Sequence, residues 1–381
     1  MPGMAAAVAL PLCLRTKLPG PWLNQSRTFV DAKVKWVRDP YLDFVVEREK
    51  DLFQAISFKN QILSDPSKSL PLSLASILKP HFHLSIPSSK FFQKYPSFFT
   101  LFQPSPGLPP RVKLTRRALS LHYEESAAFD SLRKDAVRRL SRLLMIAGGG
   151  RLPLRLVEQL RWDFGLPHDF VASLLSDFPD YFHVCEVPNT SDGKPELALE
   201  IVSWRKDLAV SELEKRSSSS SDSKRIAFPM SFPRGFDLVK KVKDWVEKWQ
   251  LLPYISPYEN GFHLPPGSDQ AEKWTVAVLH ELLWLTVSKK TERENLLVLG
   301  EWLGFGSRMF KKALVHHPGI FYVSNKIRTQ TVVLREAYRK DFLVEKHPLM
   351  AMRYRHIHLL NQMPKTLTKP SVSVDHGIRR I

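Results

Sequence analysis

One pattern of helices and strands occurs three times along this chain, and this repetition constrains the fold more than any other feature. In the clearest copy, apolar residues recur at helical spacing from Leu152 to Leu160, before a turn and a second apolar helix ending near Leu175. Pro179 cannot continue a helix, and the β-favouring residues 181–187 that follow it predict a strand. This copy therefore predicts two helices followed by a strand.

The other two copies lie on either side of this one. The later copy aligns with it without gaps from Thr291 to Pro318, and the earlier copy runs from Leu70 to Phe102 with small gaps. In the later copy, His317 precedes the proline where the other copies have an aromatic residue. The order of the parts is nevertheless the same in all three.

After its first strand, each copy continues through a turn into a second β-favouring segment, at residues 111–115, 197–202 and 331–335. In the first and third copies we expect a helix next, reaching Glu125 and about Lys346 respectively. Two helices followed by a β-hairpin are the plan of a helix-turn-helix with a wing.

Short antiparallel returns between helices favour an α+β fold over a doubly wound parallel sheet. We therefore expect an α+β, mostly helical protein of three tandem helix–helix–β-hairpin units, winged-helix-like, with connecting helices. Two connecting helices are predicted at residues 130–146 and 237–250, where apolar residues recur at helical spacing.

These patterns divide the chain into six parts. The predicted parts are a transit peptide (1–30), a first unit (31–147), a second unit (148–216), a serine-rich loop (217–226), a connecting helix with the third unit (227–346), and a C-terminal tail (347–381). The residues after Met363 include few large apolar side chains, so we expect that part of the tail to be disordered.

The first 30 residues contain three basic side chains and no acidic one. This composition is typical of a mitochondrial or chloroplast transit peptide, and we favour the mitochondrion. The alternative is a basic N-terminus without a targeting role. The longest apolar run, residues 4–14, is broken by Pro11 and falls short of the ~20 residues that span a bilayer, so we expect a soluble protein without a membrane partner.

The net charge points to a polyanionic partner. The chain has 56 basic and 38 acidic residues, a net charge of +18, beyond the magnitude of about 2–8 that solubility requires of a small domain. Residues 31–150 have 19 basic and 11 acidic side chains, and residues 231–381 have 24 and 14, whereas residues 151–230 have 10 and 13. The first and third units are therefore the better candidates to face a nucleic acid.

Basic residues near the predicted hairpins and helices would neutralise phosphates, and an aromatic neighbour would stack on unpaired bases. Each of these residues, taken alone, is also compatible with a solvated surface charge. The candidate RNA-binding residues are Lys33, Lys35, Trp36, Arg38, Arg111, Lys113, Arg116, Arg117, Arg138, Arg139, Arg142, Arg308, Lys311, Lys312, Lys326 and Arg328.

Patterns that carry catalysis were not found. Gly148-Gly149-Gly150 lacks the Lys-Ser/Thr of a phosphate-binding loop, and no Gly-x-Ser-x-Gly elbow occurs. The paired histidines have no nearby carboxylate or thiol at a metal-ligand spacing, and two cysteines cannot form a Cys-rich zinc site. We therefore predict a non-enzymatic protein without a metal or another cofactor.

Several segments resemble the plant organelle RNA recognition domain family. The segments that carry the resemblance are 33–43, 92–99, 112–125, 152–154, 160–167, 178–182, 228–236 and 249–254. The resemblance spans about residues 30–350 and implies RNA binding in mitochondria or chloroplasts, with members that act in group II intron splicing. It implies no catalytic residues, and it provides no map of base contacts.

The resemblance favours an organellar RNA-binding protein that binds structured intron RNA, with organellar intron transcripts and other splicing factors as its expected partners. A hairpin after a helix-turn-helix would also suit an organellar DNA-binding winged-helix protein. A protein-interaction adaptor in a ribonucleoprotein is the remaining alternative. Binding to nucleic acid that weakens steeply with salt would separate the first two from the third.

Overall fold

The computed structural model describes residues 36–188, 193–218, 225–232 and 239–362. The predicted transit peptide, most of the serine-rich loop and the chain after residue 362 lie outside these ranges, as do Lys33 and Lys35. No helix within the described ranges is both long enough and apolar enough to cross a membrane.

The predicted order of two helices and a β-hairpin occurs three times, and each copy, called a unit from here on, begins with a short strand that was not predicted. The first unit comprises β1 (Leu70–Pro71), α3 (Leu72–Ile77), α4 (Ser88–Lys94), β2 (Phe99–Phe102) and β3 (Arg111–Leu114). The second comprises β4 (Arg151–Pro153), α7 (Leu154–Leu160), the π-helical turn η2 (Val171–Leu175), β5 (Phe182–Pro188) and β6 (Pro195–Ile201). The third comprises β7 (Lys290–Glu292), α11 (Arg293–Trp302), α12 (Ser307–His316), β8 (Phe321–Ser324) and β9 (Thr331–Leu334).

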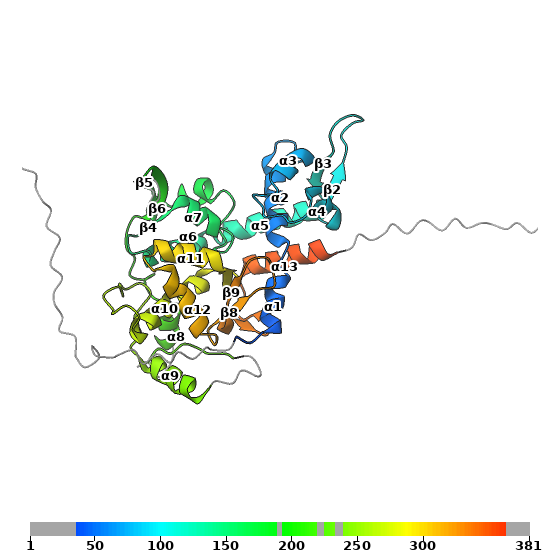
Figure 1. Ribbon diagram of the computed structural model, residues 1–381. Coiled ribbons are helices and arrows are strands. Elements are labelled where there is room, and N and C mark those ends of the chain that lie inside the picture. Colours follow the sequence, from blue (N-terminus) through cyan, green and yellow to red (C-terminus); the bar gives the residue numbers. More distant parts are fainter. Residues whose placement is uncertain (1–35, 189–192, 219–224, 233–238, 363–381) are drawn as a thin grey trace, which may run out of the picture.

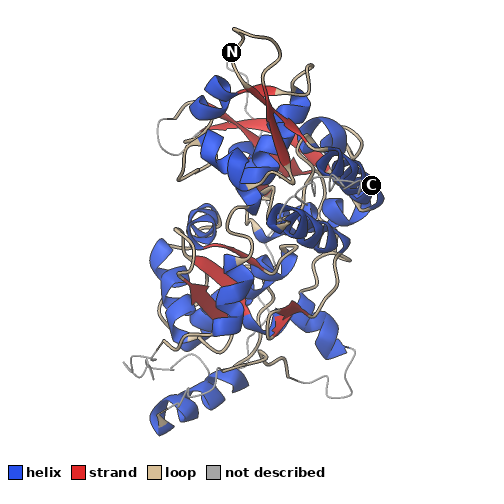
Figure 2. Cartoon of the chain, turned by 90° about the vertical axis from the view of Figure 1, so that its right-hand side faces the viewer, coloured by secondary structure: helices blue, strands red, loops and turns tan. Residues whose placement is uncertain are grey.

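Each unit forms a three-stranded antiparallel sheet with the same strand order. The orders are β1-β3-β2, β4-β6-β5 and β7-β9-β8, so the last strand of each unit is central. Its residues pair with the hairpin partner on one side, as Val332 does with Val323, and with the short first strand on the other. Figure 2 shows these small sheets surrounded by helices. The repeated pattern in the sequence therefore corresponds to a repeated topology.

The remaining helices precede, connect and follow the units. They are α1 (Pro40–Glu47), α2 (Leu52–Ser64), α5 (Arg116–Ser131), α6 (Arg133–Ile146), α8 (Glu212–Ser218), α9 (Lys240–Leu251), α10 (Asp269–Leu285) and α13 (Pro348–Asn361). α6 and α9 confirm the two predicted connecting helices, and α5 confirms the helix predicted to reach Glu125. The Thr115 hydroxyl caps α5 by accepting the N–H of Ala118 at 3.2 Å.

The buried apolar side chains form two main clusters. One is shared by the second and third units and by α6 and α10, and the other belongs to the first unit. In Figure 1 the first unit accordingly stands apart from the other two, with α5 and α13 beside it. α10 is buried on nearly every side within the shared core.

The chain after β9 differs from the prediction of a helix to about Lys346, which is wrong. It forms a 3₁₀ turn, η3 (Arg335–Ala337), and a small hairpin of β10 (Tyr338–Arg339) and β11 (Phe342–Leu343). The hairpin turns at Lys340, which adopts a positive φ of 59°. α13 follows within the range assigned to the tail, and its buried Leu359 and Leu360 join the core of the first unit.

Candidate nucleic-acid interface

α12, the second helix of the third unit, has one buried face and one exposed basic face. Phe310 and Ala313 are fully buried against the core. Arg308 and Lys311, one helical turn apart, are exposed on the opposite side. α12 can lie close to α11 because Gly300 has no side chain. A Cβ at this position would be 2.8 Å from the Phe310 ring, closer than real Cβ atoms come.

A groove of about 250 Å³ lies between α12, the β8–β9 hairpin and the start of the described chain. Lys311 lines it from α12, Trp36 from the N-terminal segment, and Arg293, Asn325 and Gln330 from the third unit. The structure thus brings together candidates that are far apart in the sequence. Arg293, Asn325 and Gln330 were not among the predicted residues, because no local pattern in the sequence places them beside Trp36.

Trp36 is held over the third unit by an aromatic contact. Its ring stacks on that of Tyr322 at a centroid distance of 6.1 Å and an interplanar angle of 17°. The Trp36 side chain nevertheless remains 52% exposed. A half-exposed indole beside basic side chains is the type of surface on which an unpaired base can stack.

Two aspartates fix the segment that follows Trp36. The Asp43 carboxylate accepts hydrogen bonds from the Tyr322 hydroxyl at 2.8 Å and from the Ser324 hydroxyl at 2.7 Å. Burial alone would raise the pKa of Asp43, but hydrogen bonds from Ser324, Arg38 and Tyr322 hold it below its ordinary value. The ionised carboxylate therefore also retains Arg38 at 2.8 Å.

Asp39 makes the second anchor of this segment. Its carboxylate accepts a hydrogen bond from the buried Arg335 guanidinium at 2.7 Å. Its backbone N–H donates to the Tyr322 oxygen at 3.2 Å. Because both anchors join the N-terminal segment to the third unit, Trp36 has a fixed place beside the groove.

The turn of the β8–β9 hairpin adds two more candidate residues. Lys326 and Arg328 are exposed there, and neither forms an ion pair with a described residue. A hydrogen bond of 2.9 Å from the Gln330 amide to the Asn325 side chain closes the turn below them. Both cations are therefore available for a phosphate.

Lys312 has a different environment from Lys311. Its ammonium group is 2.6 Å from Glu272 on α10, and His316 and His317 contact the same carboxylate at 3.0 Å. Burial would raise the pKa of Glu272, but these three side chains lower it far below its ordinary value. Lys312 thus joins α12 to the core as well as lying at its surface.

Near the first unit, some candidate residues are exposed and others form hydrogen bonds with neighbouring groups. Lys113 is exposed and lies 4.9 Å from the ring centroid of Phe102, and Arg116 is exposed at the start of α5. Arg117 donates a hydrogen bond of 3.2 Å to the Gln362 side chain. Arg111 is partly buried, with its guanidinium 2.8 Å from the hydroxyls of Ser67 and Ser69, and so connects the sheet to the preceding loop.

Two of the three candidate RNA-binding residues on α6, Arg139 and Arg142, are buried and do not lie on an exposed basic face. Arg138 is exposed, but Arg139 is buried and contacts Asp135 and the Phe164 carbonyl oxygen. Their partners come from distant parts of the chain, so helical periodicity alone could not reveal their burial. Neither guanidinium is therefore exposed where a phosphate could reach it.

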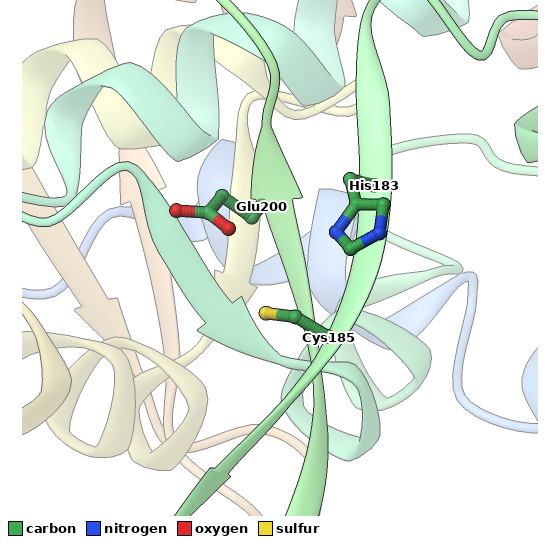
Figure 3. Close-up of side chains that lie close together, drawn as sticks. All are labelled: His183, Cys185 and Glu200. Atoms are coloured by element: carbon green, nitrogen blue, oxygen red, sulfur yellow. The ribbon is translucent and has the colours of Figure 1, made fainter.

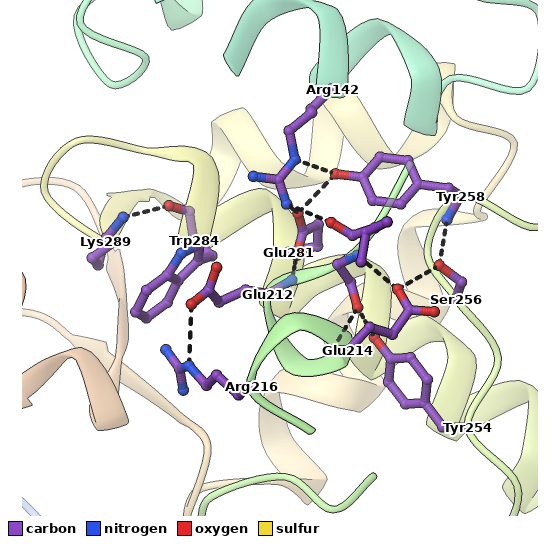
Figure 4. A network of polar contacts seen from close by, with 12 residues as sticks. Arg142, Glu212, Glu214, Arg216, Tyr254, Ser256, Tyr258, Glu281, Trp284 and Lys289 are labelled. Atoms are coloured by element: carbon purple, nitrogen blue, oxygen red, sulfur yellow. Dashed lines mark hydrogen bonds and ion pairs between the residues drawn. The ribbon is translucent and has the colours of Figure 1, made fainter. Parts of the chain in front are cut away.

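The surroundings of Arg142 are shown in Figure 4. Its guanidinium forms an ion pair with Glu281 of α10 and donates a hydrogen bond of 2.9 Å to the Tyr258 hydroxyl. Glu281 also accepts the backbone N–H of Glu212 at 3.0 Å, at the start of α8. Arg142 therefore stabilises the packing of three helices.

The model of the plant organelle RNA recognition domain matches residues 37–365, which span all three units. The chain belongs to this family. The match includes the groove of the third unit apart from Trp36, which lies one residue before it. As a member of the plant organelle RNA recognition family, the chain is an organellar RNA-binding protein.

Similar proteins of the family cover most of this chain. It is 35% identical to the protein WHAT'S THIS FACTOR 9, mitochondrial, of Arabidopsis thaliana, over 89% of this chain and 87% of that protein. It is 33% identical to ROOT PRIMORDIUM DEFECTIVE 1 of the same plant, over 90% and 86% of the two chains. The WHAT'S THIS FACTOR 1 protein of Zea mays, chloroplastic, is 30% identical over 84% and 66%. No solved structure matches the chain.

Proposed function

We propose that this member of the family binds structured intron RNA in mitochondria and promotes group II intron splicing without catalysing a reaction itself. The observation that carries the proposal is the groove of the third unit, where Trp36, Lys311 and the β8–β9 turn meet. Basic side chains would hold the phosphates while the indole stacks on an unpaired base. The mitochondrial relative at 35% identity supports the choice of organelle.

Within this proposal each unit acts as a winged helix. α12 has the place of the second helix of a helix-turn-helix, and the turn between β8 and β9 is the tip of its wing. Arg308 and Lys311 on the helix and Lys326 on the wing would then contact one stretch of backbone. Other splicing factors are expected as further partners in the ribonucleoprotein.

The proposal is tested with two triple variants of equal charge. The first, Arg308→Gln/Lys311→Gln/Lys326→Gln, removes three exposed cations from the third unit. The matched control, Arg151→Gln/Arg155→Gln/Lys206→Gln, removes three exposed cations from the second unit and the loop after it. Both are titrated with intron RNA in filter-binding experiments over a range of salt concentrations.

The first variant should bind RNA roughly tenfold more weakly or worse, and its plot of log affinity against log salt should be shallower by about 2, because each lost phosphate contact removes ~0.7 for a single strand. The control should change little. Equal losses in the two variants would contradict the assignment of the groove.

The DNA-binding alternative is separated by competition at one salt concentration. An unlabelled intron RNA should displace the bound RNA at a lower concentration than a DNA duplex of equal length, because stacking on Trp36 requires unpaired bases. A duplex that competes as well as RNA would favour a DNA-binding protein. Affinity that does not respond to salt would favour the adaptor instead.

A further inference from the structure

The hairpin of the second unit carries three possible metal ligands on one face. His183 and Cys185 are two residues apart on β5, so their side chains point to the same side of the strand. Glu200 on β6 lies directly opposite His183 in the antiparallel register. Figure 3 shows the three side chains together on the two neighbouring strands.

The ligand atoms of these side chains are already close to one another. One nitrogen of His183, the Cys185 sulfur and one carboxylate oxygen of Glu200 all lie within 4.8 Å of each other. In a tetrahedral zinc site, bonds of about 2.0–2.3 Å place the ligand atoms roughly 3.5 Å apart. Small side-chain rotations on a paired backbone would close that difference.

The Cys185 thiol lies beside the Glu200 carboxylate. Burial raises the pKa of the thiol, and the Glu200 carboxylate raises it further by its charge and by a hydrogen bond. A divalent cation between the two groups would reverse this effect, because it stabilises the thiolate and the carboxylate together.

We propose that His183, Cys185 and Glu200 bind one Zn²⁺-like divalent ion, with solvent at the fourth position. A nitrogen, a sulfur and an oxygen ligand suit zinc or cobalt better than magnesium or calcium, which prefer oxygen ligands alone. On binding, the Cys185 S–H bond breaks, the sulfur bonds the metal, and the proton passes to solvent. The bound ion joins β5 to β6.

Arg151 sets a limit on the affinity of this site. It lies opposite Glu200 on β4, the other neighbour of β6, and its charge acts on Cys185. A guanidinium at this place competes with the cation for the carboxylate. Replacing it with an uncharged side chain should therefore tighten metal binding, which a merely structural role of the three ligands would not produce.

The test uses the full chain and Co²⁺, whose bond to a thiolate gives a charge-transfer absorption in the near ultraviolet. Cys185→Ser should abolish this absorption, whereas Cys13→Ser, at the other cysteine of the chain, should retain it at one ion per protein. His183→Ala should weaken binding at least tenfold, Arg151→Gln should strengthen it, and Zn²⁺ should displace the cobalt.

Equal absorption in Cys185→Ser and the unmodified chain would overturn the proposal. So would a dissociation constant above about 100 µM, or an affinity that is the same in His183→Ala. RNA affinity is measured in parallel with and without metal. The proposed RNA groove is on another unit, so failure of either proposal leaves the other intact.

Discussion

A buried ion pair joins α2 and α5, the two helices that precede and follow the first unit. Lys59 on α2 is 2% exposed and forms an ion pair with the buried Glu125 on α5. Burial alone would raise the pKa of Glu125, but His356 and Lys59 lower it to about 2. Because the folded pKa lies below the unfolded value of about 4.3, the stability from this carboxylate is complete above that value and is lost as the pH falls towards 2.

Lys59→Met tests this pair by leaving the Glu125 carboxylate without its closest cation. A buried charge that loses its partner costs roughly 3–5 kcal/mol, whereas replacing both partners with apolar groups is often nearly neutral. We expect Lys59→Met to lower the free energy of unfolding by that amount in urea titrations, and Lys59→Met/Glu125→Leu to recover most of it. A double variant no more stable than Lys59→Met would contradict this, and would indicate that the contact of Glu125 with His356 stabilises the protein without Lys59.

At the scale of elements, the close contact between α11 and α12 determines where the basic face of α12 lies relative to the groove. Gly300 in α11 faces the buried ring of Phe310, and no other residue type fits there without movement. Gly306, just before α12, has open space around it instead. The two glycines therefore make a matched pair for substitution.

Gly300→Ala should displace Phe310 and destabilise the protein by about 1–3 kcal/mol, as overpacking of a core does. The shift of α12 should also weaken RNA binding. Gly306→Ala should cost less than about 1 kcal/mol, since only a preference at the helix N-terminus is lost. Thermal unfolding and RNA titration of both variants check this, and equal effects would contradict the role of the close contact.

Which elements could be predicted depends on their local signals. A proline cannot continue a helix, so Pro179 and Pro318 each mark the end of one. The sequence therefore reveals the helix before each proline and the strand after it. β1, β4 and β7 have only two or three residues and too little periodicity to detect. α10 is apolar on nearly every side, so it lacks the amphipathic stripe by which surface helices are found.

At the scale of the whole molecule, α13 connects the first unit to the other two. Leu359 and Leu360 belong to the core of the first unit. Earlier in α13, the buried Arg353 guanidinium donates a hydrogen bond to the Trp162 carbonyl oxygen. It also lies 3.9 Å from the centroid of the Trp162 ring. A segment assigned to a tail from its sequence is thus part of the structure.

Truncation separates the helix from the residues after it. A chain that ends at Gln362 should unfold at the same temperature as the full chain. A chain that ends at His347 loses the buried Leu349, Met350, Leu359 and Leu360. At about 1.5–3 kcal/mol for each buried side chain, that loss is comparable to the stability of a typical domain.

We therefore expect rapid hydrogen exchange in α2 and α5 of the shorter chain, with α10 still protected. Protection in α2 and α5 that matches the full chain would contradict the bridging role of α13.

The candidate interface was only partly predictable, because it depends on contacts between distant parts of the chain, as the packing of α13 does. Charge by region favours the first and third units, and Lys311, Lys326 and Arg328 are indeed exposed in the third. The contact of Trp36 with Tyr322, however, joins opposite ends of the chain. The burial of Arg139 and Arg142 likewise depends on partners that no local pattern identifies.

The most direct test of RNA binding in the groove is ultraviolet cross-linking of the protein to intron RNA, with the cross-linked peptides mapped by mass spectrometry. We predict cross-links on the segment around Trp36, on α12 and on the β8–β9 turn. Cross-links concentrated instead on the β5–β6 hairpin of the second unit, with none in the third, would contradict the account.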